Sequence, residues 1–243
     1  MESKLIYLTI ILIEIYCLTE EKHLNKIIIP NNDSEITLLI RGSGEQYILY
    51  NKFSSLPNEV NINGNKTYFI NNQPKIFLKD ELNMVTLKWK NKISSCNYMF
   101  YSITNIIELD LSKFDASSVK SMNYMFRNCS FLKSINLTNF NTSQVIESCS
   151  MFNGCSSLLS LDLSSFNTAK NENMGHFFYR CSSLTFLNLS NFNTSKVKYM
   201  DNMFKGCTAL VSLDLYNFDF SSINNINGMF SSCNKLEYIN LNN

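Results

Sequence analysis

Residues 186–210 read FLNLSNFNTSKVKYMDNMFKGCTAL, and the same order of residue types returns at intervals of 26 residues through the second part of the chain. Several ladders keep this step in one register: Phe100, Phe126, Phe152, Phe178, Phe204 and Phe230; Phe114, Phe140, Phe166, Phe192 and Phe218; Leu109, Ile135, Leu161, Leu187, Leu213 and Ile239; Cys129, Cys155, Cys181, Cys207 and Cys233. A period between 20 and 50 residues is typical of stacked repeats, in which each unit buries its apolar face only against its neighbours.

Each unit is predicted to contain one strand and one short helical segment. Leu158, Leu161 and Leu163 follow the spacing L-x-x-L-x-L, whose last part alternates as a strand does. Apolar residues in the other half of a unit fall on one face of a helix or 3₁₀ turn: Val197, Met200, Met203, Phe204 and Cys207. The sequence therefore predicts an α/β fold, a leucine-rich-repeat-like solenoid of parallel strands and short helical turns over residues 85–243.

The segment 20–84 predicts a small β-rich module that caps the solenoid. Two apolar runs flank Gly42 and Gly44, which predicts a hairpin, and Asn63-Gly64 predicts a second hairpin with a type I′ turn. Alternation of Val85, Leu87 and Trp89 predicts a strand with one buried face. A module of this size is marginally stable alone, so we expect it to pack onto the first repeat.

Residues 1–19, MESKLIYLTIILIEIYCLT, predict a secretory signal peptide. Lys4 precedes an apolar run from Leu5 to Ile13, which is shorter than the ~20 apolar residues that a membrane-spanning helix needs. The alternative is a buried N-terminal strand or helix. No second apolar segment of spanning length follows, so we expect a mature chain without a transmembrane helix.

Charge and composition exclude several function classes. The chain has 243 residues, 45% of them hydrophobic, and a net charge of +1, which provides no basic field for nucleic acid. The two histidines, His23 and His176, are far apart in the sequence and stand in no catalytic or zinc-binding pattern. We expect no enzyme activity, no metal and no cofactor, and His176 to be a partly exposed residue on the convex side.

The cysteine ladder has three interpretations. Stacking would place neighbouring Cα atoms within the range of a disulfide, but equivalent side chains in a stack point the same way and do not converge. A free cysteine behaves as a small buried hydrophobe. We therefore expect buried thiols rather than disulfides or a metal site, with Cys96 also in the core and Cys149, one place out of step, exposed.

Polar residues between the strand leucines form a row, the Asp/Asn row, in strict alternation: Asp110, Asn136, Asp162, Asn188, Asp214 and Asn240. Alternation doubles the distance between carboxylates to about 10 Å, which limits their repulsion. The row is either a solvated sheet face or a recognition strip on the concave face. Neighbours that would complete the strip are Ser112, Thr138, Ser164, Ser190 and Tyr216.

Glycosylation sequons begin at Asn32, Asn65, Asn128, Asn136, Asn141, Asn188 and Asn193. Asn32 and Asn65, in loop or hairpin contexts, are the better candidates. Asn141 and Asn193 follow the second phenylalanine ladder, where we expect the side chain to bond the backbone of a turn.

Three stretches carry a family resemblance: SLDLSSFNT (160–168), ELDLSKFDASSVKSMNYMFRNCSFL (108–132) and the segment 186–210. They resemble the units of BspA-type leucine-rich-repeat surface proteins, over roughly residues 85–243. Departures are Ile103 for the first cysteine, Phe177 for a methionine, and the stretch 142–149, which lacks the usual methionine. The resemblance implies a secreted or surface-displayed binding protein without catalytic activity.

Two functions follow. The first is a non-enzymatic, secreted or cell-surface adhesion protein that binds a protein or glycan of another cell or matrix through the Asp/Asn row. The alternative, which applies if residues 1–19 are retained, is an intracellular scaffold for protein–protein interaction. The strand expected at Tyr238–Leu241 has no capping unit after it, which predicts either a truncated gene product or end-to-end self-association.

Overall fold

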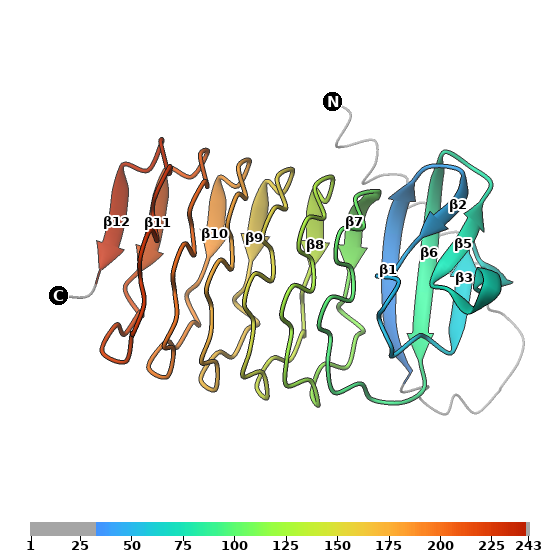
Figure 1. Cartoon of the computed structure of the whole chain (residues 1–243), viewed down its shortest axis with the longest axis horizontal. Coiled ribbons are helices and arrows are strands. Elements are labelled where there is room, and N and C mark those ends of the chain that lie inside the picture. The colour runs from blue at the N-terminus through green and yellow to red at the C-terminus, as the bar shows by residue number, and fades with distance from the viewer. Residues whose placement is uncertain (1–32, 242–243) are drawn as a thin grey trace, which may run out of the picture. The chain divides into compact units, whose positions relative to one another are not determined.

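The computed structural model describes residues 33–241, and these are almost entirely strands and turns (Figure 1). The strands are β1 (Ser34–Arg41), β2 (Gly44–Tyr47), β3 (Glu59–Ile62), β4 (Asn65–Thr67), β5 (Lys75–Leu78), β6 (Leu82–Trp89), β7 (Ile106–Asp110), β8 (Ser134–Asn136), β9 (Ser160–Asp162), β10 (Phe186–Asn188), β11 (Ser212–Leu215) and β12 (Tyr238–Leu241). The one helical element among the described residues is the 3₁₀ turn η1 (Ile70–Asn72). The predicted α/β leucine-rich-repeat-like solenoid is therefore wrong: the fold is β, with one six-stranded mixed sheet and three two-stranded sheets.

The N-terminal strands β1 to β6 bear out one predicted hairpin and contradict the other. Strands β3 and β4 pair antiparallel around Asn63 and Gly64, both with positive φ as a type I′ turn requires. Strands β1 and β2, on either side of Gly42, do not pair with each other: β1 pairs with β6 and β7, and β2 pairs with β5. The glycines turn the chain out of one sheet into another. The alternation on β6 is confirmed, since Val85, Leu87 and Trp89 are all buried.

The six-stranded sheet joins the N-terminal strands to the repeats. Its order is β4-β3-β6-β1-β7-β8, with β1 antiparallel to β7 and β7 parallel to β8. The Trp89 indole packs edge-on against Phe114, with ring centroids 5.6 Å apart. The predicted boundary between residues 84 and 85 falls inside β6, and the described residues share one hydrophobic core. The predicted signal peptide, residues 1–19, lies outside the described residues, as does the start of the segment 20–84.

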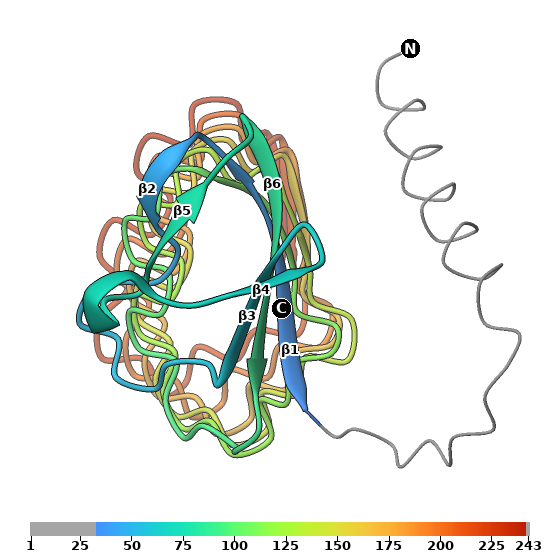
Figure 2. The same cartoon turned by 90° about the vertical axis from the view of Figure 1, so that its right-hand side faces the viewer.

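Residues 26 apart in the sequence pair with each other from β7 onward. Parallel ladders join β7 to β8, β9 to β10 and β11 to β12, so Leu161 lies opposite Leu187 and Leu213 opposite Ile239. A second row of parallel bridges runs along another side of the units: Ser95, Ser121, Glu147, Asn173, Tyr199 and Asn225. Viewed along the direction in which the units stack, the turns of successive units superimpose (Figure 2).

The segments predicted as helical are consecutive turns. In 197–207, the amide of Met203 bonds the carbonyl of Met200 within its own unit, whereas the amide of Phe204 bonds the carbonyl of Met229 in the next unit. Because Asn202 and Gly206 have left-handed φ values, alternate backbone amides point towards the neighbouring unit. Because half of the amides are used between units, the i→i−4 ladder of a helix cannot form, although the predicted apolar face is buried.

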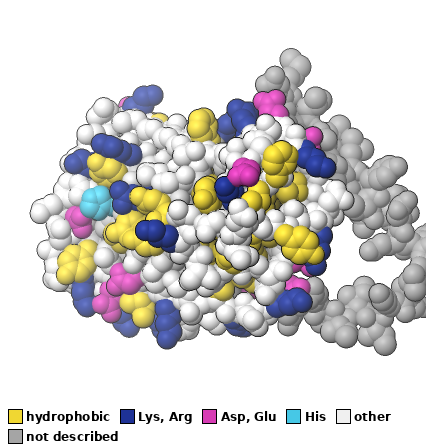
Figure 3. All heavy atoms as spheres, turned by 45° about the vertical axis from the view of Figure 1, so that its right-hand side comes forward, with side chains coloured by type: hydrophobic (Ala, Val, Ile, Leu, Met, Phe, Trp, Pro, Cys, Tyr) yellow, Lys and Arg dark blue, Asp and Glu magenta, His cyan; other side chains and the backbone are white. Residues whose placement is uncertain are grey.

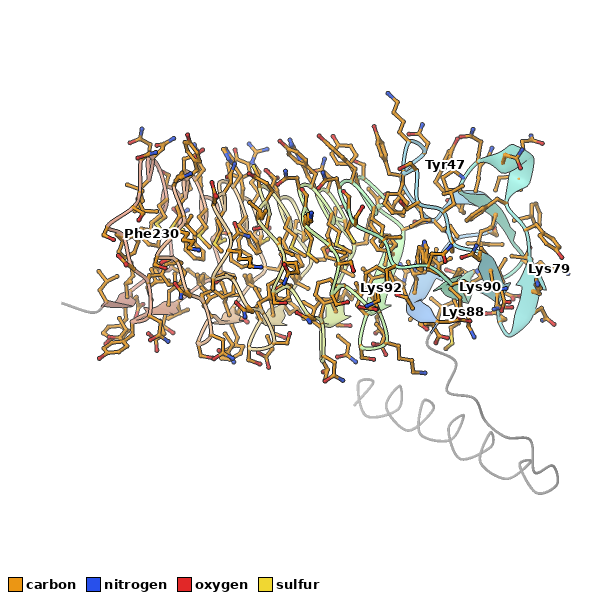
Figure 4. The ribbon with its side chains drawn as sticks, turned by 90° about the horizontal axis from the view of Figure 1, so that it is seen from below. Tyr47, Lys79, Lys88, Lys90, Lys92 and Phe230 are labelled. Carbon is orange, nitrogen blue, oxygen red and sulfur yellow. The ribbon has the colours of Figure 1, made fainter. Side chains whose placement is uncertain are left out.

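Two files of phenylalanine rings run through the core. In the first, Phe100 to Phe230, successive ring centroids lie 5.2–6.0 Å apart. In the second, Phe114 to Phe218, the spacing is 5.8–6.4 Å. Figure 4 labels Phe230, which lies at the end of the file away from Lys88 and Lys90 of the N-terminal strands. Stacked rings hold neighbouring units at one strand spacing and fix their register.

The cysteine ladder consists of free thiols. Cys129, Cys155, Cys181 and Cys207 are buried, Cys96 is buried in the same core, and Cys233 and Cys149 are half-buried. Each ladder thiol donates a hydrogen bond to the carbonyl oxygen of a phenylalanine in the preceding unit, as Cys155 Sγ does to Phe126 O over 3.1 Å. The expectation of buried thiols is confirmed for the ladder up to Cys207, and the thiols also link the units.

Candidate binding face

The Asp/Asn row lies on the outer side of strands β7 to β12. Alternation places strand residues on opposite faces, so the leucines point into the core and the row points to solvent. Asp110, Asp162 and Asp214 are exposed, as is Asn136, while Asn188 and Asn240 are half-buried. The structure thus brings the six predicted residues onto one face.

Every member of the row up to Asp214 caps the backbone two residues further on. The Oδ1 atom accepts the amide hydrogen of the predicted neighbours Ser112, Thr138, Ser164, Ser190 and Tyr216, over 2.8–3.1 Å. These bonds terminate each strand and fix χ1 of the row. Hydrogen bonding by the Ser164 amide lowers the pKa of Asp162, so this carboxylate stays charged.

The alternation of Asp and Asn also has a structural cause. Asn188 Nδ2 donates to Asp162 Oδ1 over 3.0 Å, and Asn240 Nδ2 donates to Asp214 Oδ1 over the same distance. A row of carboxylates alone has no donor, whereas an amide donates to the carboxylate before it. Asp214 Oδ2 accepts no hydrogen bond from the described residues and remains open to a ligand.

Two exposed aromatic side chains flank this part of the row. Phe186 of β10 is 59% exposed, and Tyr216, after β11, is 54% exposed. Together with Asn188, Asp214 and Asn240 they line a hollow of about 440 Å³. The hollow spans β10 and β11, which belong to different sheets. Phe186 was missed by sequence reasoning; the signal was its position, which is serine in the units before and after, Ser160 and Ser212.

The other predicted residues lie apart from this hollow. Asn65 is exposed in β4, beside the turn at Asn63-Gly64, and Asn32 lies outside the described residues. Asn141 and Asn193 accept the amides of Ser143 and Ser195, as expected for turn residues. Their glycosylation stays a prediction.

His176 does not line the hollow beside the Asp/Asn row. The ring of His176 is partly exposed, and its Nδ1 atom lies 3.3 Å from Asp201 Oδ2. Within residues 33–241, no group of three His, Cys, Asp or Glu side chains is placed to hold a metal ion.

None of the helical structure in the range 33–241 is long or apolar enough to span a bilayer. Strand β12 pairs with β11 alone among the described strands, and its association with another chain stays a prediction.

Comparison with known proteins identifies one family. A family model described as "Mycoplasma protein of unknown function, DUF285" matches residues 94–210 and residues 162–242, which together cover more than half of the chain. No curated protein matches the chain. No solved structure matches it either.

Proposed function

The chain belongs to the DUF285 family, whose description assigns no activity, and we propose from its strand face that it is a non-enzymatic binding protein for glycans. The observation that carries the proposal is the hollow between Phe186 and Tyr216, where exposed aromatic rings stand beside a fixed row of carboxylate and amide groups. Exposed aromatic side chains on a rigid surface are typical of ligand sites.

Each group in the hollow has a counterpart on a sugar. The ring faces of Phe186 and Tyr216 can pack against the C–H side of a sugar ring. Asp214 Oδ2 can accept a hydrogen bond from a sugar hydroxyl, and the side-chain amides of Asn188 and Asn240 can donate and accept hydrogen bonds. The backbone caps and the bonds between row members hold these groups before a ligand arrives, which reduces the entropy lost on binding.

We further propose that the protein acts as a secreted or surface-displayed adhesin. The apolar segment near the start of the sequence and the BspA-type resemblance of the repeats support this placement. The alternative is an intracellular scaffold for protein–protein interaction. Sequencing the N-terminus of the natural protein separates the two: a start near Glu20 supports export, and retention of residues 1–19 supports the scaffold.

The glycan proposal is tested with the full chain on an array of immobilised neutral and acidic oligosaccharides, followed by titration of a retained neutral one. Phe186→Ser introduces the residue that the neighbouring units carry at this position, so we expect the fold to be kept and the affinity to fall about tenfold or more, ~1.4 kcal/mol. Phe131→Ser is the matched control, because Phe131 is equally exposed (58%) away from the hollow and serine follows it one unit later. No retained neutral oligosaccharide, or equal losses in both variants, would refute the proposal.

A further inference from the structure

A second hollow, of about 600 Å³, opens over the turns that carry the methionine-phenylalanine pairs. None of its lining residues belongs to the Asp/Asn row or to the first hollow. It spans four successive units, from the unit of Tyr124 and Arg127 to the unit of Asp201.

The hollow exists because one unit carries small side chains where its neighbours carry large ones. Tyr98 and Tyr124 stack with ring centroids 4.8 Å apart, and the next position in this file is Ser150. At the position of Arg127, the same unit has Asn153. The tyrosine stack therefore stops at Tyr124, and the space beyond it stays open. This unit is also the one whose stretch 142–149 departs from the repeat pattern.

Two arginines at the hollow have no counter-ion. The Arg127 guanidinium lies over the Tyr124 ring, with its Cζ atom 5.5 Å from the centroid, and Arg180 lies over Tyr179 at 5.1 Å. Neither makes an ion pair with any residue in the range 33–241, and Arg127 Nε is inaccessible to solvent without a hydrogen-bond acceptor there. Stacking covers one face of each guanidinium and leaves its terminal Nη groups, whose in-plane N–H bonds match the oxygens of a carboxylate or sulfate.

The remaining lining residues fit the polar part of such a ligand. Asp201 is the one carboxylate of the lining, so Arg127 and Arg180 leave the hollow with an excess of positive charge. The neutral lining is made of hydroxyl and amide groups, including Ser150, Asn153 and Asn173, rather than of apolar side pockets for peptide side chains. Figure 3 shows a face on which Lys and Arg side chains lie next to hydrophobic ones, with a histidine between them.

We propose that this hollow is a binding site for an acidic oligosaccharide, whose carboxylate or sulfate groups are held by Arg127 and Arg180 and whose hydroxyls bond the neutral lining. The two arginines belong to units two steps apart, so their charges are separated by roughly 10 Å along the file, which suits a repeating anionic chain. The site is independent of the strand face proposed above.

The test measures the affinity of the full chain for four soluble probes: oligogalacturonate, a sulfated heparin oligosaccharide, a neutral maltooligosaccharide and, as the acidic peptide, oligoglutamate. We expect one or both acidic sugars to bind more tightly than the neutral sugar and the peptide, and binding to weaken with salt. Arg180→Gln should reduce the affinity about tenfold. Arg180→Lys, which keeps the charge and loses the planar fork, should lose less.

Ser150→Tyr is the sharper variant, because it continues the stack of Tyr98 and Tyr124 into the hollow. Ser150 already has a φ of 56°, close to the 60° of both tyrosines, so the backbone accepts the change. We expect the melting temperature to be kept and acidic sugar binding to be lost, while the exposed Lys196→Gln changes the affinity less than about twofold. Unaltered acidic sugar binding in Ser150→Tyr, tighter binding of oligoglutamate, or binding of neither acidic sugar would overturn the proposal. Because Phe186→Ser leaves this hollow intact, failure at the strand face does not decide this test.

Discussion

Cys181 donates its thiol hydrogen to the carbonyl oxygen of Phe152, 3.1 Å away in the preceding unit, and both residues are buried. The bond repeats along the ladder, and each thiol is a second donor to a carbonyl that already accepts an amide of its own unit, as Phe152 O accepts the Cys155 amide. The buried thiols also pack in the core as small hydrophobic groups. The ladder therefore contributes packing and hydrogen bonding between units.

Replacing Cys181 with alanine should lower the free energy of unfolding by about 1–3 kcal/mol, because it removes a buried side chain and one of the two hydrogen bonds to the Phe152 carbonyl. Cys149→Ala serves as the control, since Cys149 is half-buried and its thiol bonds no buried carbonyl. Urea denaturation monitored by circular dichroism measures both. Equal effects of the two substitutions would contradict the role given to the ladder.

Alkaline pH should destabilise the protein through the same thiols. Burial raises the pKa of Cys207 to about 12 and raises those of Cys155 and Cys181 well above the ordinary value. In the unfolded chain a thiol ionises near 8.5, so above that pH unfolding releases protons and stability falls as pH rises towards the folded pKa. Each thiol contributes about 1.4 kcal/mol per pH unit.

The contribution of one thiol is isolated by comparing the wild type with Cys207→Ala between pH 9.5 and 11 under reducing conditions. We expect the wild type to lose stability more steeply, by about 1.4 kcal/mol per pH unit. Tyrosines and lysines titrate in both proteins and cancel in the difference. Parallel pH profiles would show that Cys207 does not retain its proton on folding.

The sequence contained the neighbour relations of the repeats but not their backbone conformation. The spacing of 26 residues identifies Leu187 as the partner of Leu161, because identical side chains align when units stack. The spacing of Met200, Met203 and Phe204 is compatible both with a helix and with successive turns, and only the bonds between units decide for turns. Residues with left-handed φ could have warned against a helix, but at these positions Tyr, Asn, Ser, His and Arg together outnumber Gly.

For a related reason, the Asp/Asn row could be predicted from the sequence and the two hollows could not. The Asp/Asn row follows from strand alternation, which fixes the outward side of each strand. The hollows depend on single residues that break a ladder, Phe186 in one case and Ser150 in the other. A departure from a repeat becomes visible as a cavity or a protrusion only when the neighbouring units are placed around it.

The buried threonines of the FNT motif should be essential for joining units. Thr168 Oγ1 donates to the carbonyl oxygen of Asn193 over 2.9 Å and accepts its amide hydrogen over 2.8 Å. Thr168→Val keeps the shape and leaves both backbone groups unpaired, so we expect a loss of about 2–3 kcal/mol in unfolding free energy. Thr138→Val, at an exposed position, should change stability by less than about 0.5 kcal/mol. A small loss for Thr168→Val would mean that its side chain acts by packing alone.

Gly154 allows its unit to pack closely against Asn128 of the preceding unit, and replacing Gly154 tests how much stability depends on this close approach. A Cβ atom at Gly154 would lie 2.6 Å from Asn128 Oδ1, at a φ of +77°. Gly64 has a similar φ of +81° with open space around it, so Gly64→Ala measures the cost of the backbone conformation alone, about 1 kcal/mol.

We expect Gly154→Ala to cost about 2 kcal/mol more than Gly64→Ala in thermal or urea unfolding, since the clash adds to the backbone cost. Adding Asn128→Ala removes the atom that the new methyl group meets, so the double variant should recover much of this difference. If the two single variants lose equal stability, or if the second substitution recovers nothing, the close approach of Gly154 to Asn128 does not limit the packing of these units.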